Sequence, residues 1–116
     1  EEMTAETVLM GGHGGVNGGA NIYPKLYTEL YKAAANRDFE TIQRLQPIVM
    51  EISTTYYTAG KNPSSYLRGL KAVLGMKGIC SGVLADPYFE FGNIEKEVLA
   101  AGMKSIDKKL KEAGIL

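Results

Sequence analysis

The nine-residue stretch Gly11-Gly12-His13-Gly14-Gly15-Val16-Asn17-Gly18-Gly19 contains six glycines and is the main indication of the fold. Glycine allows a backbone segment to lie close to another segment or to a ligand. We expect a short strand over 14–17, with one helix before it and one helix after it. A single strand leaves its backbone N–H and C=O groups without partners. The order helix–strand–helix therefore indicates one unit of a larger parallel sheet, and the chain reads as the last part of something longer.

Apolar residues at helical spacing predict that the rest of the chain is mostly α-helical. Tyr23, Tyr27 and Tyr31 recur at every fourth position, and Pro24 suits the first turn of their helix. Residues 76–92 show no clean period and are expected to form a loop. Five helices are expected: from Thr4 to Met10, from Pro24 to Asn36, from Asp38 to near Gly60, from Asn62 to Gly75 and from Asn93 to Gly114.

Helix ends and buried positions can also be predicted. Thr4, Asp38, Asn62 and Asn93 are the expected N-caps, because their side chains can accept a hydrogen bond from the first turn. Cys80 is expected to be a small buried hydrophobe. The last helix has an apolar stripe that is expected to be buried, formed by Ile94, Val98, Leu99, Met103, Ile106 and Leu110.

Composition excludes several classes of function. Thirteen Lys and Arg balance thirteen Asp and Glu, which argues against a nucleic-acid binder or a polybasic membrane-surface protein. No apolar run approaches the roughly 18 residues of a membrane-spanning helix. A single cysteine, Cys80, and a single histidine, His13, cannot make a structural zinc site, and no metal or cofactor is expected. The expectation is a soluble, cytoplasmic, globular protein.

The glycine stretch allows more than one chemical interpretation. A phosphate cradle is one, but neither a P-loop nor a Gly-x-Gly-x-x-Gly register fits. His13 is an acid–base candidate, although no acidic or nucleophilic residue lies near it at a recognisable spacing. The preferred interpretation is that the glycines line a pocket where a ligand comes near the backbone. The tyrosine stripe favours a core face over a proton relay.

Several segments together resemble one enzyme family. The stretch 11–21 resembles the eighth-strand segment of the dihydrodipicolinate synthase / N-acetylneuraminate lyase family, which has a Gly-Gly-x-Gly-x-x-Ser type sequence ending in Ala-Asn. Three further segments also resemble that family: the turn at 36–39, Asn62-Pro63 followed by the Lys71-Ala72-Val73-Leu74-Gly75 segment, and the ending at 110–116. The resemblance covers essentially the whole chain.

The resemblance implies a fold and a division of the chain. The class is α/β: residues 1–36 would be the last part of a (β/α)₈ barrel, containing helix 7, strand 8 and helix 8. Residues 37–116 would be a C-terminal helical extension that packs under the barrel and shapes subunit contacts in a dimer or tetramer. TIM barrels take about 250 residues, so the N-terminal part of the barrel would be the partner of this chain.

The resemblance also implies a reaction. Family members form a Schiff base between a lysine and pyruvate or another 2-keto acid, with a tyrosine assisting proton transfer. Both residues would lie upstream of Glu1, so the chain alone is expected to be inactive. Val16 matches the apolar residue beside the keto-acid adduct, Gly15 and Asn17 flank it, and Glu1 and Glu2 would lie near the mouth of the pocket.

Departures from the family pattern favour one branch of it. Gly18 and Gly19 replace a bulkier pair, which is expected to enlarge the mouth for a longer substrate, and the segment 84–87 lacks an Arg-Pro pairing. These features favour a lyase for 2-keto-3-deoxy sugar acids over a dihydrodipicolinate synthase of lysine biosynthesis. Two alternatives of other classes are a non-catalytic helical association module and an independent anion-binding protein.

Overall fold

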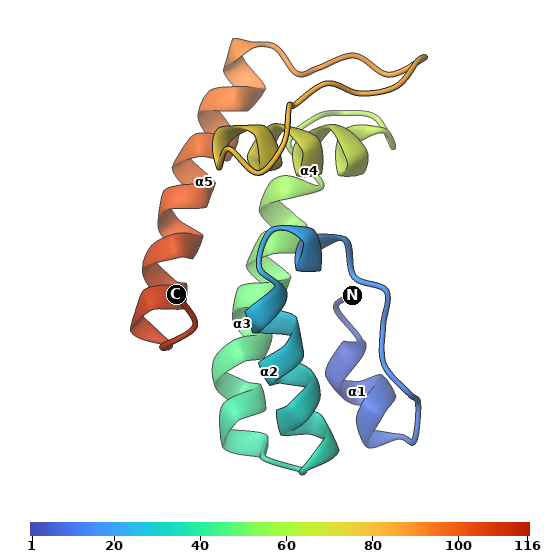
Figure 1. Ribbon diagram of the computed structural model, residues 1–116, viewed down its shortest axis with the longest axis vertical. Coiled ribbons are helices and arrows are strands. Elements are labelled where there is room, and N and C mark those ends of the chain that lie inside the picture. Colours follow the sequence, from blue (N-terminus) through green and yellow to red (C-terminus); the bar gives the residue numbers. More distant parts are fainter.

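The computed structural model describes residues 1–116 and consists of helices joined by loops (Figure 1). The elements in chain order are α1 (Thr4–Leu9), the short 3₁₀ helix η1 (Gly18–Asn21), α2 (Pro24–Ala35), α3 (Phe39–Tyr56), α4 (Ser65–Met76) and α5 (Asn93–Glu112). The five α-helices are those that the sequence predicts. Residues 77–92 form the expected loop between α4 and α5.

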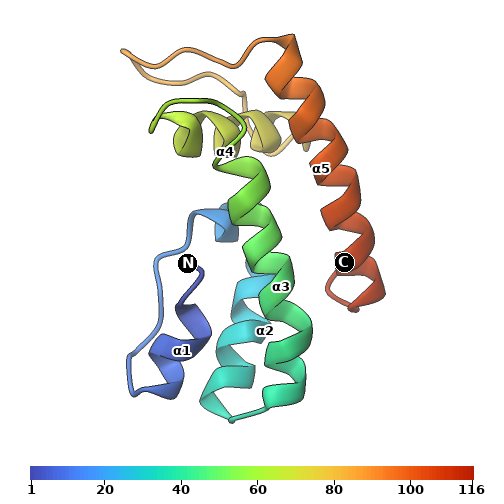
Figure 2. The ribbon, with the colours of Figure 1, turned by 180° about the vertical axis from the view of Figure 1, so that it is seen from behind.

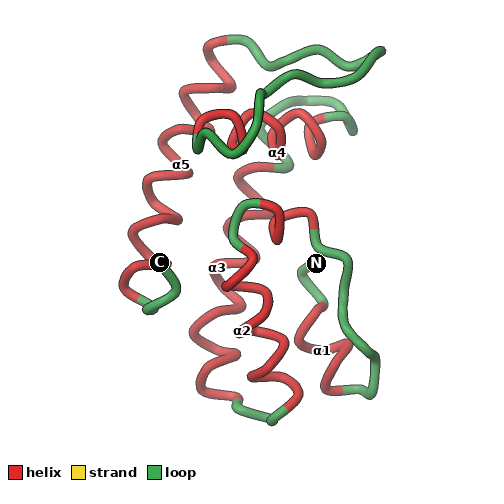
Figure 3. The backbone as a smooth tube through the Cα atoms, in the orientation of Figure 1, coloured by secondary structure: helices red, strands yellow, loops and turns green.

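The expected strand over 14–17 is absent. The glycine segment (residues 11–19) runs as a loop from the end of α1 to η1 (Figure 3), and residues 13–16 make no backbone hydrogen bond. Asn17 nevertheless has extended backbone angles, φ −92° and ψ 126°. A strand requires a partner to which its N–H and C=O groups can bond, and this chain provides none beside the glycine segment.

One hydrophobic core joins the helices. α1, α2 and α3 lie side by side, α5 packs against α3, and α4 lies across the end of α3 next to η1 (Figures 1 and 2). The core combines residues from 1–36 and from 37–116, so the two parts of the chain pack as one body. Its fully buried large side chains are Leu26, Leu30, Leu45, Val49, Ile52, Tyr56, Val73, Leu99, Ile106 and Leu110.

A polar chain inside this body ties α5 to the start of α2. The hydroxyl of Tyr23 donates to Asp107 at 2.7 Å and lies 2.9 Å from the hydroxyl of Tyr56. Lys77 pairs with Asp107 at 2.8 Å and lies over the Tyr23 ring. Burial, followed by these hydrogen bonds, raises the pKa of Tyr23, so its hydroxyl stays protonated. Tyr23 and Tyr56 are therefore structural, and for Tyr23 this agrees with the core face that the tyrosine stripe predicts.

Only one of the four expected N-caps is correct. Asp38 caps α3 by accepting a hydrogen bond from the Thr41 amide at 3.1 Å. The other three helices have Met3, Ser64 and Gly92 at the N-cap position, none with a side-chain bond. The flanking backbone, rather than the side-chain preference, decides these helix starts.

Four residues expected to be buried are exposed, and Tyr31 of the tyrosine stripe, at 41 %, is one of them. Ile94 and Val98 are 78 % and 52 % exposed, because the first turns of α5 extend beyond the helices it packs against (Figure 1). Cys80 is also exposed, in the loop after α4. None of the helices combines the length and the apolarity that crossing a bilayer requires.

Candidate functional site

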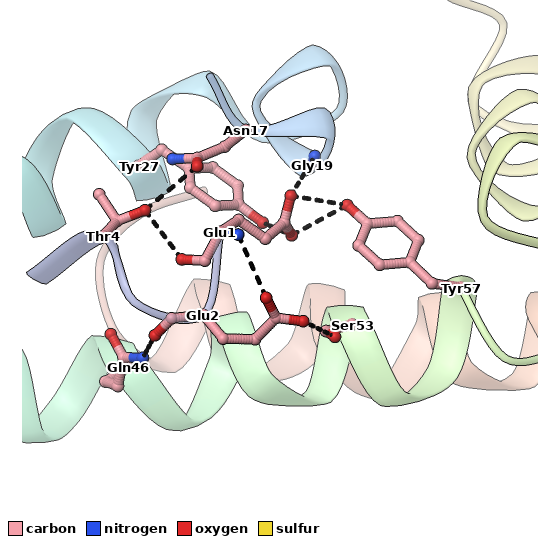
Figure 4. A network of polar contacts seen from close by, with 9 residues as sticks. All are labelled: Glu1, Glu2, Thr4, Asn17, Gly19, Tyr27, Gln46, Ser53 and Tyr57. Carbon is pink, nitrogen blue, oxygen red and sulfur yellow. Dashed lines mark hydrogen bonds and ion pairs between the residues drawn. The ribbon is translucent and has the colours of Figure 1, made fainter. Parts of the chain in front are cut away.

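The centre of the candidate site is the carboxylate of Glu1 (Figure 4). Its Oε1 accepts hydrogen bonds from the Tyr27 hydroxyl at 2.6 Å and the Tyr57 hydroxyl at 2.9 Å. Its Oε2 accepts one from the Gly19 amide at 3.0 Å. Only 4 % of the Glu1 side chain is exposed. The carboxylate therefore joins α2, α3 and the end of the glycine segment at one point.

The two tyrosines that bind Glu1 stay protonated. Burial raises the pKa of Tyr27 and of Tyr57, and the hydrogen bond to Glu1 raises each further. Both hydroxyls therefore donate to the carboxylate at neutral pH. All three donors to the Glu1 carboxylate are neutral, and the N-terminal ammonium beside it pairs with the Glu2 carboxylate at 3.1 Å.

The next residue, Glu2, is fastened to α3 (Figure 4). The Ser53 hydroxyl donates to its carboxylate, and the side-chain amide of Gln46 donates to its backbone carbonyl. The bond from Ser53 is the main reason that the pKa of Glu2 falls to about 2. Glu2 is therefore ionised throughout the neutral range, beside Glu1.

A cavity of about 480 Å³ lies between α1, the glycine segment and α2. His13, Gly15 and Asn17 line it from the glycine segment, and Tyr31 lines it from α2. The Thr4 hydroxyl lies 3.1 Å from Oδ1 of Asn17, which fixes Asn17 against α1. Gly15 thus lines a cavity, and the expectation that the glycines line a pocket for a ligand stays a prediction.

The three expected substrate-binding residues do not share one side of the glycine segment. Gly15 and Asn17 line the cavity on the side of the helices, whereas Val16 is fully exposed and takes no part in it. Successive side chains of an extended segment point to opposite sides, which explains the separation. The Val16 side chain therefore lies on the side of the glycine segment that faces away from the helices of this chain.

Gly18 and Gly19 make room for tyrosines. A Cβ at Gly18 would overlap the hydroxyl of Tyr66, and one at Gly19 would overlap the hydroxyl of Tyr27. The expected larger mouth is therefore partly filled, because Tyr66 from α4 lies where a bulkier residue 18 would be. The contact of Tyr66 with Gly18 places α4 beside the end of the glycine segment, where η1 begins (Figure 1).

The sequence alone does not single out Tyr57, Ser53 or Tyr66 for this site. Ser53 and Tyr57 lie 51 and 56 positions from their partners Glu2 and Glu1. No local spacing signals such contacts, since the packing of α3 against α1 and η1 creates them. No three His, Cys, Asp or Glu side chains come close enough together to hold a metal ion.

The chain is similar to a family of known enzymes. The model of the dihydrodipicolinate synthetase family matches residues 1–106. A 4-hydroxy-tetrahydrodipicolinate synthase of Bartonella quintana (strain Toulouse) is 27 % identical over 106 residues, which cover 91 % of this chain and 32 % of that protein. An uncharacterized DapA-like lyase of Pyrococcus abyssi (strain GE5 / Orsay) is 32 % identical over 89 residues, which cover 76 % of this chain and 29 % of that protein.

A solved structure shows the same arrangement of helices. The dihydrodipicolinate synthase from Bacteroides thetaiotaomicron is 50 % identical and superposes with a TM-score of 0.87. The match covers 90 % of this chain and 35 % of that one. The chain thus spans about a third of the length of the relatives that it matches.

Proposed function

Because this chain belongs to the dihydrodipicolinate synthetase family and corresponds to the C-terminal part of its (β/α)₈ barrel, we propose that the protein carrying it is a Schiff-base lyase or aldolase. The proposed substrates are pyruvate or another 2-keto acid, and an aldehyde. The observation that carries the proposal is the glycine segment, which has an unpaired backbone over 13–16 and an exposed Val16. Both features fit the eighth strand of a barrel whose other strands lie elsewhere in the protein.

The proposed reaction divides the work between this chain and the rest of the barrel. A lysine outside residues 1–116 attacks C2 of the keto acid and expels water, which gives a Schiff base. Loss of a proton from the adduct gives an enamine that adds to the aldehyde carbon. In our proposal Val16 forms the wall beside this adduct. Gly15 and Asn17 flank Val16 in the chain and lie on the side of the segment that faces the helices. Asn17 keeps the wall in place through its contact with Thr4.

Two substrate types are open to test. The carboxylate of Glu1, which is bonded to the Gly19 amide of the glycine segment, favours an uncharged, hydroxylated aldehyde, as in the cleavage of 2-keto-3-deoxy sugar acids. The names of the relatives favour dihydrodipicolinate synthesis as the second candidate, above all the structure that is 50 % identical. We propose the sugar-acid type first, with the protein as a cytoplasmic dimer or tetramer.

The test is an activity assay of the full-length product that carries residues 1–116. The protein is supplied with pyruvate and glyceraldehyde, or with pyruvate and aspartate semialdehyde, and consumption of pyruvate is followed. Turnover of the first pair supports the sugar-acid type, and turnover of the second pair alone supports the synthase. A well-folded full-length protein that consumes pyruvate with neither aldehyde would instead support a non-catalytic helical association module.

A further inference from the structure

Tyr66 is a residue of the helical extension whose hydroxyl group has no hydrogen-bond partner within this chain. Its hydroxyl lies over Gly18 and makes no hydrogen bond to any residue of the chain. The residue is 43 % exposed. A buried structural tyrosine such as Tyr23 or Tyr27 has its hydroxyl bonded, and Tyr66 differs from both.

The ring of Tyr66 is held in place although its hydroxyl is free. It packs edge-on against Tyr57, with ring centroids 4.5 Å apart and an angle of 61° between the rings. Tyr57 is itself fixed by its bonds to Glu1. The absence of a side chain at Gly18 leaves the space that the Tyr66 hydroxyl occupies. A rigid ring with an unpaired hydroxyl is the form of a group that binds something from outside.

The location of this hydroxyl decides what it can bind. Gly18 follows Asn17 directly, at the carboxyl end of the glycine segment, and active sites of barrel enzymes lie at the carboxyl ends of strands. Gly18, over which the Tyr66 hydroxyl lies, is two residues beyond Val16 in this direction. A substrate whose keto-acid end lies against Val16 would therefore extend its other end toward Tyr66.

The charges around Tyr66 select the class of group. The Glu1 carboxylate is bonded to Tyr57, which packs against Tyr66, and to the amide of Gly19, which follows Gly18, so a negative charge lies near the Tyr66 hydroxyl. Burial, and then the charges of Glu1 and Glu2, raise the pKa of this hydroxyl, which therefore stays protonated. A carboxylate or phosphate at this place would be repelled. A neutral hydroxyl group can both accept from Tyr66 and tolerate the potential.

We propose that Tyr66 is a specificity-determining residue, whose hydroxyl donates a hydrogen bond to a hydroxyl of an uncharged aldehyde at the open end of the site. This inference rests on the proposed lyase function. Gly18 is the positioning residue, because its missing side chain admits the Tyr66 hydroxyl. The C-terminal extension thus supplies part of the substrate site in addition to its packing role.

The test compares two aldehydes in the full-length protein, each with pyruvate. Glyceraldehyde carries hydroxyls, and propanal is the same three-carbon aldehyde without them. Tyr66→Phe removes the hydroxyl and keeps the ring, so it should lower kcat/KM for glyceraldehyde about three- to tenfold, as expected for one neutral hydrogen bond. For propanal we expect a change of less than about twofold. Tyr88→Phe is the matched control, since Tyr88 is also 43 % exposed but lies in the loop between α4 and α5.

A second pair of variants tests the role of Gly18. Gly18→Ala should lower kcat/KM for glyceraldehyde in the wild-type protein, because the added Cβ displaces the Tyr66 hydroxyl. In a Tyr66→Ala background the same change should have little effect, because the space is already free. Any of three results would overturn the inference. Tyr66→Phe lowers kcat/KM equally for both aldehydes, it lowers kcat/KM for neither, or Gly18→Ala has the same effect in both backgrounds. A wild-type protein that turns over neither aldehyde would instead remove the proposed function, and this inference with it.

Discussion

The hydroxyl of Tyr57, the residue directly after α3, donates a hydrogen bond to the Glu1 carboxylate at 2.9 Å, although the two residues are 56 positions apart in the chain. This bond connects the helical extension to the start of the chain, and through the Gly19 amide to the glycine segment. The position of the glycine segment is therefore set from α3 as well as from its neighbours in sequence.

Tyr57→Phe should destabilise the full-length protein. The change leaves a buried carboxylate with two donors in place of three, and such a loss costs about 1–3 kcal/mol in the free energy of unfolding. Urea unfolding of the wild type and the variant measures the difference. Tyr88→Phe, at an exposed tyrosine, is the control and should change the free energy of unfolding by less than about 0.5 kcal/mol. Equal stability of the wild type and Tyr57→Phe would show that this bond contributes nothing.

Stability in acid should depend on Ser53. The folded protein lowers the pKa of Glu2 from 4.5 to about 2, so the stability that Glu2 contributes is present above pH 4.5 and is lost as the pH falls toward 2. Ser53→Ala should bring the pKa of Glu2 in the folded protein closer to 4.5. The variant should then lose less stability than the wild type between pH 4.5 and pH 2. Urea midpoints measured from pH 6 to pH 2.5 test this, with Thr54→Ala as the neighbouring control. Parallel curves for the wild type and Ser53→Ala would contradict the assignment.

Gly69→Ala should be among the most destabilising small changes in α4. A Cβ at this position would overlap the backbone carbonyl of Tyr56, which a side-chain movement cannot relieve. We expect a loss of about 3 kcal/mol in the free energy of unfolding, from overpacking between α3 and α4. At Gly82 the nearest atom to an added Cβ is 3.7 Å away, so Gly82→Ala is the control and should be almost neutral. A Gly69→Ala protein as stable as Gly82→Ala would mean that α3 and α4 pack less closely than described.

Val16→Asp should impair binding of the keto acid. In the proposed barrel this change places a carboxylate beside the carboxylate of the substrate, and like charges at short range repel. We expect KM for pyruvate to rise about tenfold or more, which corresponds to about 1.4 kcal/mol. Val83→Asp, at a valine that is 61 % exposed in the loop after α4, is the control. If both variants keep the wild-type KM, Val16 does not face the substrate.

Most of the fold follows from local pattern, and most of the site does not. The spacing of Leu45, Val49 and Ile52 predicts α3 and its buried face correctly, because one helix alone decides it. The starts of α1, α4 and α5 differ from the expected caps by one or two residues, because neighbouring backbone decides them. Cys80 and Ile94 are exposed because their burial depends on what lies beside them, which a single sequence does not state.

The contacts of the candidate site depend even more than the helix ends on residues that are distant in the sequence. The composition of the glycine segment marks it as a candidate site, and the structure places Gly15 and Asn17 beside a cavity on the side of the helices. Their role in binding substrate stays a prediction. The bonds of Glu1 to Tyr27 and Tyr57 were not predictable, since they arise where three elements meet. The glycine pair at 18–19 suggests open space in the sequence, whereas tyrosine hydroxyls occupy that space in the structure.

Borohydride trapping tests the central claim most directly. The full-length product is incubated with pyruvate and borohydride, digested, and its peptides are weighed by mass spectrometry; reduction fixes a Schiff base on the lysine that formed it. The account predicts a pyruvate adduct on one lysine outside residues 1–116, with every lysine within them unmodified. An adduct on a lysine of residues 1–116, or no adduct on any lysine, would contradict it.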